Sequence, residues 1–351
     1  MADVMKRAAV LGASGYTGVE AVRLITAHPR LKLTALTGHS KAGQPYGAIY
    51  PSLAHLNLPD VVKADEVNWD EVDVVFACLP HGASQDTIAK IAARVETVID
   101  LSADFRLSDP ELYAKTYGRS HDHTELLKGA VYGLTEFARD ELAGAKLVAC
   151  PGCYPTCSLL ALLPALDAGL IDPSRIIIDA KSGVTGAGRK ASLAFAYSEV
   201  ADGAHAYGVG SHRHAPEIDQ IIARHTPKGT QSAVTFTPHL IPMNRGMIAT
   251  CYVELSKGIS AQDLHSAYVA RYADEHFVHV EAYGVAPQTR HIRSTNYARI
   301  GVFADRVQGR AIIISVIDNL TKGSSGQALQ NYNVIQGWDE TLGLTGQAVF
   351  P

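Results

Sequence analysis

The feature that most constrains the fold is a glycine-rich turn near the start of the chain. Residues 8–14 are apolar or small, and Gly12, Gly15 and Gly18 follow at three-residue spacing. Apolar residues then recur at helical spacing, which predicts a helix over 19–29. A strand, a glycine turn and a helix begin many nucleotide-binding sheets. The spacing differs from the common G-x-G-x-x-G pattern, so the position of the turn carries the prediction more than the spacing does.

Short apolar segments and helical patterns alternate through the first half of the chain. Further strands are predicted at 31–38, 73–80, 97–102 and 146–152, and helices at 83–95 and 155–169. The segment 73–80 is almost continuously apolar, as expected for a strand that is buried on both faces. We therefore predict an α/β fold with a parallel, doubly wound, Rossmann-type sheet. The polar stretch 104–125 is predicted to be a surface loop with a short helix.

The second half has longer apolar segments and fewer helices. Strands are predicted at 175–183, 233–243, 247–255, 297–305 and 309–318, and helices at 215–226 and 260–275. Consecutive strands with few crossovers favour a mixed or antiparallel sheet in an α+β domain. A last helix over 324–338 is expected to return to the first domain. The predicted domains are therefore 1–152 with 319–351, and 153–318.

The composition bounds the class of protein. The net charge is −4, so there is no basic field to hold nucleic acid or an acidic membrane. No apolar run approaches the roughly 20 residues that span a bilayer, and the N-terminus lacks a signal-peptide pattern. The five cysteines are too few and uneven for a disulfide framework. We expect a cytoplasmic protein with a small-molecule substrate.

Three of the cysteines fall within one short stretch, "CPGCYPTC". A zinc site would need further ligands at suitable spacing, and none follows, so no metal is expected. Cys150 ends an apolar strand and Cys157 lies inside a helix, where cysteine behaves as a small hydrophobe. Cys153 lies at the strand-to-helix junction, where the helix dipole lowers a thiol pKa. Cys153 is therefore the predicted nucleophile, at the sheet edge that faces the cofactor.

The end of the second strand indicates which nucleotide is bound. NAD-binding proteins tend to carry an acidic residue there, whereas this chain has Thr37, Ser40 and Lys41. Hydroxyls and a cation favour a 2′-phosphate, hence NADP, although an ordinary polar loop would look the same. A thiolate beside NADP indicates that a cysteine thioester is reduced by hydride to an aldehyde.

That chemistry needs proton donors and anion holders. The segment "GSHRHAPEI" offers His212, His214 and Glu217, although a single histidine among 15 is more often structural. Arg106, and the segment "KSGVTGAGR" with its Arg189, are candidates to hold an acyl phosphate. Ordinary surface arginines are the alternative for both.

These motifs, taken in order, resemble the N-acetyl-gamma-glutamyl-phosphate reductases, NADPH-dependent enzymes of arginine biosynthesis. The resemblance spans nearly the whole chain and includes "GASGYTG", "CLPHG", "DLSADFR", "PGCYPT", "GSHRHAPEI" and "DNLTKGSSGQALQNYN". It implies a fold like that of aspartate-semialdehyde and glyceraldehyde-3-phosphate dehydrogenases. It also implies a dimer or tetramer whose contacts come from the second domain.

The expected site combines the motifs with this resemblance. Cys153 is the nucleophile, His212 is preferred to His214 as the acid–base group, and Glu217 orients or tunes it. The expected cofactor contacts are Gly12, Ala13, Ser14, Gly15, Tyr16, Thr17, Gly18, Thr37, Ser40, Lys41, Leu79, Pro80, Ser182, Gly183 and Asn319. The expected substrate contacts are Arg106, Ser102, Tyr154, Arg189 and His81.

Two other functions remain open from the sequence. The same chemistry could serve a shorter acyl phosphate, as in aspartate-semialdehyde dehydrogenase, or an aminoadipyl phosphate, free or on a carrier protein, because pocket loops decide the substrate. A non-catalytic NADP-binding redox sensor could keep the glycine turn and a reactive cysteine. It would have no need of the histidine cluster.

Overall fold

The computed structural model describes residues 5–230 and 233–349. The chain divides into two compact units. The first contains residues up to 151 together with 324–345, and the second contains 152–323 together with the residues from 346 on. Each unit has its own seven-stranded sheet.

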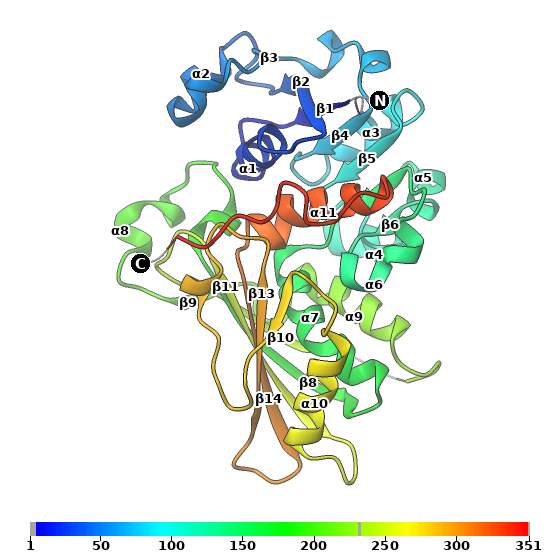
Figure 1. The fold of residues 1–351 in the computed structure, drawn as a ribbon, viewed down its shortest axis with the longest axis vertical. Helices are drawn as coiled ribbons and strands as arrows, with labels where there is room; N and C mark the ends of the chain where they lie inside the picture. Colours follow the sequence, from blue (N-terminus) through cyan, green and yellow to red (C-terminus); the bar gives the residue numbers. More distant parts are fainter. Residues whose placement is uncertain (1–4, 231–232, 350–351) are drawn as a thin grey trace. The chain divides into compact units, whose positions relative to one another are not determined.

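The sheet of the first unit is entirely parallel (Figure 1). In spatial order its strands are β3 (Val61–Val62), β2 (Leu31–Thr37), β1 (Lys6–Leu11), β4 (Val74–Ala77), β5 (Thr97–Asp100), β7 (Leu147–Ala149) and β6 (Val131–Tyr132). The chain starts in the middle and winds outward in both directions, as in nucleotide-binding sheets. The predicted Rossmann-type sheet is confirmed.

Helices cover both faces of this sheet. They are α1 (Tyr16–Thr26), α2 (Tyr46–Ile49), α3 (Ser84–Ile91), α4 (Pro110–Tyr117), α5 (Thr124–Lys128), α6 (Thr135–Leu142) and α11 (Gly326–Ile335), with 3-10 turns at Pro51–Leu56, Ala64–Glu66 and Trp69–Glu71. Leu11 and Val75 face a core that includes Ile88 of α3. Phe76 points to the opposite face, where its ring lies 6.0 Å from that of Tyr332 in α11.

The C-terminal helix α11 belongs to the first unit and is fixed there by buried amides. The side chain of Asn331 accepts a hydrogen bond from the Thr135 hydroxyl at 2.6 Å and donates one to the Gly133 carbonyl at 2.8 Å. His28 of the first unit lies 3.0 Å from Asn333. Buried amides that all find partners fix one docking geometry, which an apolar surface alone would leave less specific.

The stretch 104–125 was predicted to be a surface loop with a short helix; the structure confirms a helix there but buries part of the stretch. This segment contains α4 and the start of α5, and Asp104, Arg106 and Tyr113 are buried. The pattern misled because polar residues here are buried with hydrogen-bond partners, which a hydropathy pattern cannot distinguish from solvent exposure.

The second unit contains a mixed sheet, as predicted. In spatial order its strands are β12 (Val278–Val280), β13 (Ala298–Ala304), β14 (Arg310–Ile317), β11 (Met247–Leu255), β8 (Ile171–Ser182), β10 (Thr235–Leu240) and β9 (His205–Ala206). Two pairs, β12 with β13 and β8 with β10, are parallel. The other four neighbouring pairs are antiparallel.

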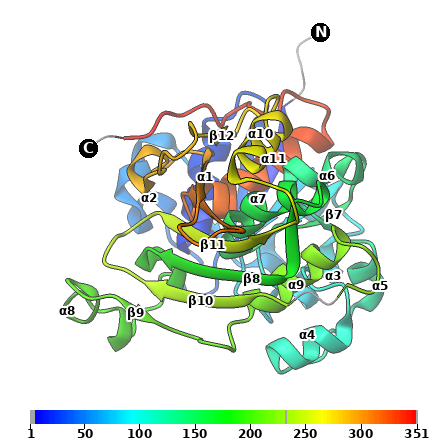
Figure 2. The same cartoon turned by 90° about the horizontal axis from the view of Figure 1, so that it is seen from below.

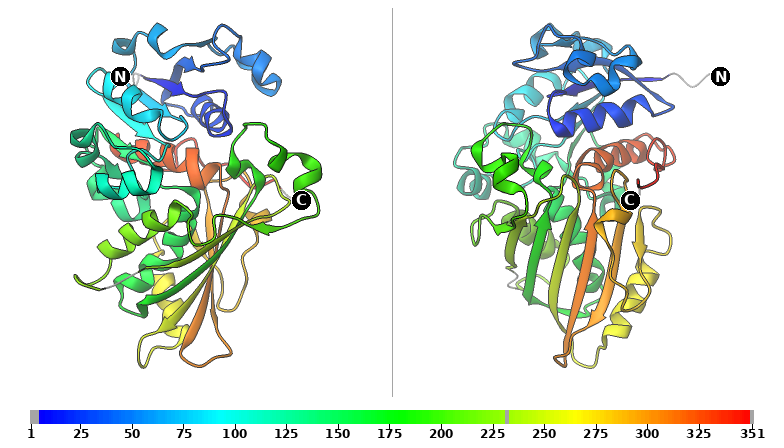
Figure 3. Two further views of the ribbon diagram at one scale, coloured as in Figure 1. Left: turned by 180° about the vertical axis from the view of Figure 1, so that it is seen from behind. Right: turned by 90° about the vertical axis from the view of Figure 1, so that its left-hand side faces the viewer.

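Three helices pack on one face of this mixed sheet (Figures 2 and 3). They are α7 (Cys153–Asp167), α9 (His214–Arg224) and α10 (Ala261–Arg271), and a short α8 (Tyr197–Val200) lies apart, near β9. Helix α7 contacts β8, β11, β14, α9 and α10, and each of its residues from Tyr154 to Leu166 is buried. A helix that is apolar all round lies at the centre of a core.

Several boundaries differ from the sequence prediction, including the first domain boundary, because Gly152 lies in the second unit. Helix α7 begins at Cys153 rather than 155, because Pro155 lies in the first turn, where no backbone N–H is needed. Residues 319–323, placed in the first domain by the sequence, lie in the second unit, as does the segment from 346. A π-helical turn over Thr321–Ser325 precedes α11.

Candidate active site

The three glycines of the first turn have different roles. Gly12 has φ +71°, and a Cβ atom there would lie 2.4 Å from the Cys78 carbonyl oxygen. A Cβ on Gly18 would lie 2.4 Å from the Gly12 oxygen, so both glycines are required by the fold itself. A Cβ on Gly15 would meet only the Gly12 oxygen, at an ordinary 3.6 Å. Gly15 is therefore the glycine that packing inside the chain does not explain.

Gly15 is the N-cap of α1 and offers no side chain to cap that helix. The first turn of α1 also has no acidic residue. An uncapped helix N-terminus reached through a glycine binds phosphate groups through its backbone N–H groups and its dipole. The predicted contacts from Gly12 to Gly18 therefore lie at a site with the chemistry that a pyrophosphate requires.

Two tyrosines that the sequence analysis missed support this turn. The Tyr46 hydroxyl donates a hydrogen bond to the Ala13 carbonyl at 2.9 Å, and the Tyr50 hydroxyl donates to the Ser14 carbonyl at 2.8 Å. Both come from the segment around α2, which follows β2. No sequence pattern linked the two segments, because the contact depends on the tertiary fold.

The end of β2 brings together the residues predicted to select the nucleotide. A Cβ added to Gly38 would lie 3.6 Å from Ser14 Oγ and 3.7 Å from Lys41 Cβ, so these two residues flank the Gly38 backbone. Thr37 is buried, its carbonyl accepts from the Ala13 N–H, and Ser40 is exposed. Hydroxyls and one ammonium group surround the place where NAD-binding proteins carry an acid.

The turn after β4 differs from the glycine turn after β1, because a carboxylate of the chain itself already binds the N–H groups at the start of the helix that follows. The buried Asp104 carboxylate accepts hydrogen bonds from the N–H groups of Gly82, Ser84 and Gln85 at 2.7 to 3.3 Å. Asp104 therefore occupies the anion position of α3 and fixes the preceding turn. That turn carries the predicted contacts Leu79, Pro80 and His81. Asp104 was missed because its segment was predicted to be a loop.

A buried carboxyl group lies beside Asp104 at the end of β5. Asp100 accepts hydrogen bonds from the Ser102 hydroxyl at 2.7 Å and the Ser84 hydroxyl at 2.9 Å. Burial raises the pKa of Asp100 to about 6. Arg106 is also buried nearby in the chain, and it donates to the carbonyls of Cys150 and Leu101 at 2.7 and 2.9 Å. Part of the Arg106 guanidinium therefore holds the ends of β5 and β7.

In the second unit, Cys153 is the first residue of α7 and is partly exposed. Burial raises the pKa of Cys150 and of Cys157 to about 12, and it raises the pKa of Cys78 and Cys251 further. These four cysteines are therefore thiols at neutral pH. Cys153 alone lies at a helix N-terminus, where the dipole favours a thiolate.

Aromatic rings and imidazoles surround this end of α7. The Tyr207 hydroxyl donates to the Tyr154 hydroxyl at 3.1 Å, and Tyr154 donates to the His239 carbonyl at 3.2 Å. Burial raises the pKa of Tyr207 to about 12, and the neighbouring Cys153 adds to the rise. The His212 ring lies 5.4 Å from that of Tyr207 and 4.8 Å from that of His214. The predicted histidine pair is therefore in one cluster with Tyr154 and Tyr207.

The protonation state of His212 follows from its surroundings. Burial and the adjacent Arg213 lower the pKa of His212 to about 4, so the ring is neutral at pH 7. Its Nδ1 accepts the His214 backbone N–H at 3.2 Å. A backbone N–H can only donate, so the proton of the neutral ring lies on Nε2. His212 can therefore offer an N–H donor at Nε2.

Glu217 ties two helix N-termini together. It lies in the first turn of α9 and is fully buried, and its Oε1 accepts the Gly152 N–H at 2.8 Å. Gly152 is the N-cap of α7 and directly precedes Cys153. The carboxylate thus fixes the backbone beside the nucleophile, and it does so from the helix that begins with His214.

The glycine-rich segment after β8 is held by main-chain and side-chain contacts. The Gly183 N–H donates to the Gly246 carbonyl at 2.9 Å, and a Cβ there would lie 2.8 Å from the Asn244 oxygen. The buried Asn319 amide donates to the Thr185 hydroxyl at 3.0 Å and accepts the Gly246 N–H at 2.9 Å. Asn319 therefore shapes this segment. The predicted residues Ser182 and Gly183 are buried, whereas Arg189 is exposed.

Gly323 is a further site residue that the sequence analysis missed. A Cβ on Gly323 would lie 2.9 Å from the Cβ of Cys153. Gly323 lies in the π-helical turn, and such turns are frequent at functional sites. Glycine and serine cluster around it in "TKGSSG" as they do in ordinary turns, so no sequence pattern distinguished Gly323.

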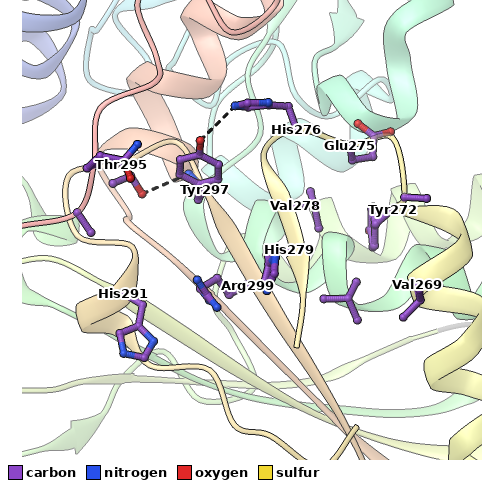
Figure 4. A pocket seen from close by; sticks show the side chains of 14 residues that line it. Val269, Tyr272, Glu275, His276, Val278, His279, His291, Thr295, Tyr297 and Arg299 are labelled. Carbon is purple, nitrogen blue, oxygen red and sulfur yellow. Dashed lines mark hydrogen bonds between the residues drawn. The ribbon is translucent and has the colours of Figure 1, made fainter. Parts of the chain in front are cut away.

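A cavity of about 550 Å³ lies elsewhere in the second unit, beside β12 and β13 (Figure 4). Its lining includes His276, His279, Tyr297 and Arg299 and none of the predicted site residues. Arg299 is engaged by Glu281 at 2.6 Å. The cavity is therefore separate from the cysteine and histidine cluster. Across the described residues, no group of three or more metal-binding side chains is present, and no helix is long and apolar enough to cross a membrane.

Comparison with known families gives the class of protein. Residues 7–145 match the semialdehyde dehydrogenase NAD binding domain, and residues 153–319 match the semialdehyde dehydrogenase dimerisation domain. Aspartate semialdehyde dehydrogenase II from Vibrio cholerae has the same fold, with a TM-score of 0.72 at 17% identity over 95% of this chain and 98% of that one. The two family matches thus define an oxidoreductase of the semialdehyde dehydrogenase class, with a domain for a nicotinamide cofactor.

Sequence relatives narrow this class. The N-acetyl-gamma-glutamyl-phosphate reductase of Rhodospirillum rubrum is 53% identical over 98% of this chain and 98% of its own. A probable chloroplastic N-acetyl-gamma-glutamyl-phosphate reductase of Arabidopsis thaliana is 50% identical over 98% of this chain and 85% of its own. The chain belongs to the N-acetyl-gamma-glutamyl-phosphate reductase family.

Proposed function

We propose that the chain reduces N-acetyl-L-glutamyl 5-phosphate to N-acetyl-L-glutamate 5-semialdehyde with NADPH, releasing phosphate, as a step of arginine biosynthesis. The observation that carries the chemistry is the environment of Cys153. It is the one cysteine at a helix N-terminus, it is partly exposed, and it lies beside tyrosines and histidines, whereas burial keeps the other four as thiols. Family membership supports the substrate.

The residues at the first glycine turn fit NADP. The uncapped start of α1 suits the pyrophosphate, and Ser14 and Lys41 flank the place where a 2′-phosphate would lie. When bound, NADPH supplies the hydride. The remaining proposed contacts are Ala13, Tyr16, Thr17, Thr37, Ser40, Leu79, Pro80, Ser182, Gly183 and Asn319.

Cys153 begins the reaction. Its thiolate attacks the acyl carbon, the C–O bond to phosphate breaks, and the phosphate takes a proton from solvent as it leaves. The acyl group is then a thioester on Cys153. Addition of hydride gives a thiohemiacetal alkoxide, whose collapse forms the aldehyde and returns the thiolate. Arg106 and Arg189 are the proposed holders of the phosphoryl group, and Ser102, Tyr154 and His81 are further proposed substrate contacts.

His212 is proposed to stabilise the oxyanions of both steps. Its imidazole is neutral at pH 7 and carries its proton on Nε2, so it can donate a hydrogen bond to an oxyanion. It keeps that proton while it does so. This role needs no net proton transfer, because the alkoxide collapses directly. Glu217 fixes the Gly152 backbone beside Cys153. His214, whose backbone N–H sets the tautomer of His212, is the remaining candidate for the acid–base role that the sequence analysis assigned first to His212.

The reverse reaction tests this function. N-acetylglutamate 5-semialdehyde, phosphate and NADP⁺ should give NADPH, the signal should depend on phosphate, and Cys153→Ser should abolish it. If NADPH formed with aspartate semialdehyde and not with the acetylated compound, the proposed mechanism would stand but the proposed substrate would be wrong. Turnover with neither compound, together with normal NADPH binding and labelling of Cys153, would support a redox sensor.

We also propose a homo-oligomer, a dimer or a tetramer, formed through the open face of the mixed sheet. Ile177, Tyr252, Ile312 and Phe303 pair in one row across β8, β11, β14 and β13. Ile177 and Tyr252 are 49% and 38% exposed, and α7 covers the opposite face. An exposed apolar row fits the dimerisation domain that this segment matches. Light scattering would give the number of subunits.

We also propose a cytoplasmic location, which is in keeping with the five free thiols.

A further inference from the structure

We propose that Asp318 is a positioning residue for the reaction, because its carboxylate and carbonyl hold the turn that places Gly323 against Cys153. This inference rests on the proposed role of Cys153 as the nucleophile. Asp318 directly follows β14 and is fully buried. It was not among the residues expected at the site.

The Asp318 carboxylate gathers three segments of the second unit. One oxygen accepts the N–H groups of Leu320 and Thr321 at 2.9 and 3.0 Å. The other accepts the Ser294 N–H at 2.7 Å and lies 3.4 Å from Nη1 of Arg245. Four donors on two oxygens satisfy a buried carboxylate, and the guanidinium offsets its charge.

Backbone contacts carry this order to the nucleophile. The Gly323 N–H donates to the Asp318 carbonyl at 2.9 Å, which closes the turn around the carboxylate. Gly323 packs so closely on Cys153 that even a methyl group would lie 2.9 Å from its Cβ. The turn therefore packs against the Cα and Cβ atoms that carry the thiol, and it forms one wall beside Cys153. Any movement of 320–323 changes that wall.

Two further observations separate this network from an ordinary turn. Ser294 has φ +63°, an unfavourable conformation for a residue with a side chain, and its N–H is held by Asp318. The adjacent Asn319 holds the glycine-rich segment through Thr185 and Gly246. Asp318 and Asn319 together thus fix both the wall beside Cys153 and the segment proposed to face the phosphate.

The substitution Asp318→Asn tests the proposal with little change in size. An amide has one acceptor oxygen, and its NH₂ group would face N–H donors, so part of the network must break. We expect iodoacetamide to alkylate Cys153 about tenfold more slowly, measured on the isolated peptide by mass spectrometry. We expect kcat to fall by a similar factor, with KM for NADPH within about twofold of the parent.

The matched control is Asp219→Asn. Asp219 lies in the same unit, and its carboxylate accepts the Val234 N–H at 2.9 Å, a contact that involves neither the turn 318–323 nor Cys153. This variant should keep the parent alkylation rate even if it lowers the melting temperature. Gly323→Ala should slow alkylation as Asp318→Asn does, and the double variant should be no slower than the slower single variant, since both act on one wall.

The proposal would be overturned if Asp318→Asn kept the alkylation rate of Cys153 and the kcat of the parent protein. It would also be overturned if Asp219→Asn slowed alkylation as much as Asp318→Asn does. If Asp318→Asn fails to fold, Arg245→Gln carries the test, because it weakens the same carboxylate with the backbone bonds intact. A threefold or smaller, but measurable, slowing is then expected, and no slowing overturns the proposal. Alkylation needs no substrate. Failure of the proposed function, seen as turnover by Cys153→Ser, is therefore read separately.

Discussion

Gly15→Ala separates the needs of the fold from the needs of the cofactor. Gly15 has φ −83° and ψ 170°, which alanine adopts readily, and its added Cβ would contact the Gly12 oxygen at 3.6 Å. Removing backbone freedom from the unfolded chain should therefore raise the free energy of unfolding by about 0.4–1 kcal/mol. The same methyl group would stand where the proposed pyrophosphate would approach α1. Loss of one charge-assisted hydrogen bond, roughly 1.5–3 kcal/mol, should raise the Kd for NADPH about 10- to 100-fold.

Calorimetric titration with NADPH checks the predicted change in Kd, and thermal unfolding without ligand checks the predicted gain in stability. Gly18→Ala is the matched control, since its Cβ would lie 2.4 Å from the Gly12 oxygen and 2.7 Å from the Ala13 Cα, and backbone atoms cannot yield. That variant should lose about 1–3 kcal/mol of stability. A parent-like Kd in Gly15→Ala would refute the placement of the pyrophosphate at α1. A lower melting temperature in Gly15→Ala without ligand would refute the steric reasoning.

Three further outcomes are expected. Cys153→Ser should lose turnover by at least about 10³-fold, whereas Cys157→Ala should act mainly on thermal stability, by about 1–2 kcal/mol, and rates with melting curves distinguish the two. His212→Asn should lower kcat about 10²-fold. Because the folded-state pKa of His212 is about 4, below the ordinary 6.5, protonation of the unfolded chain should cost stability as pH falls from 6.5 towards 4. Denaturant titrations at several pH values should show the free energy of unfolding of the parent falling over this pH range, and falling less in His212→Asn. An equal fall in both proteins would contradict the low pKa of His212. Lys41→Ala should raise KM for NADPH about tenfold and leave KM for NADH unchanged, measured at low salt.

Local patterns predicted the fold because they agree with the tertiary structure over long stretches. The apolar strands of the first half are buried on both faces, so they stand out from the helices between them. The position of Cys153 at a helix N-terminus could also be predicted, since a strand end, a glycine and a helical pattern together indicate where a helix begins. The start of α7 was missed by two residues, because prolines within a first turn look like a break.

The supporting residues could not be predicted in the same way. Tyr46, Asp104 and Gly323 act through contacts with segments far away in the sequence, and their own surroundings resemble ordinary loops. A single sequence shows no pairing between distant positions. Asn319 differs, because the motif singled it out as a cofactor contact, whereas the structure shows that its amide holds Thr185 and Gly246.

The distribution of the cysteines makes the chain its own reporter of unfolding. In the native state the one partly exposed thiol at a helix N-terminus, Cys153, should label first, and it is attached to a helix buried along nearly its whole length. Such a helix exchanges its amide hydrogens only with large-scale opening. The buried Cys157 and Cys251 then report opening of the second unit, and the buried Cys150 reports opening of the first. Pulse labelling during denaturation would therefore follow the two units separately, without any introduced probe.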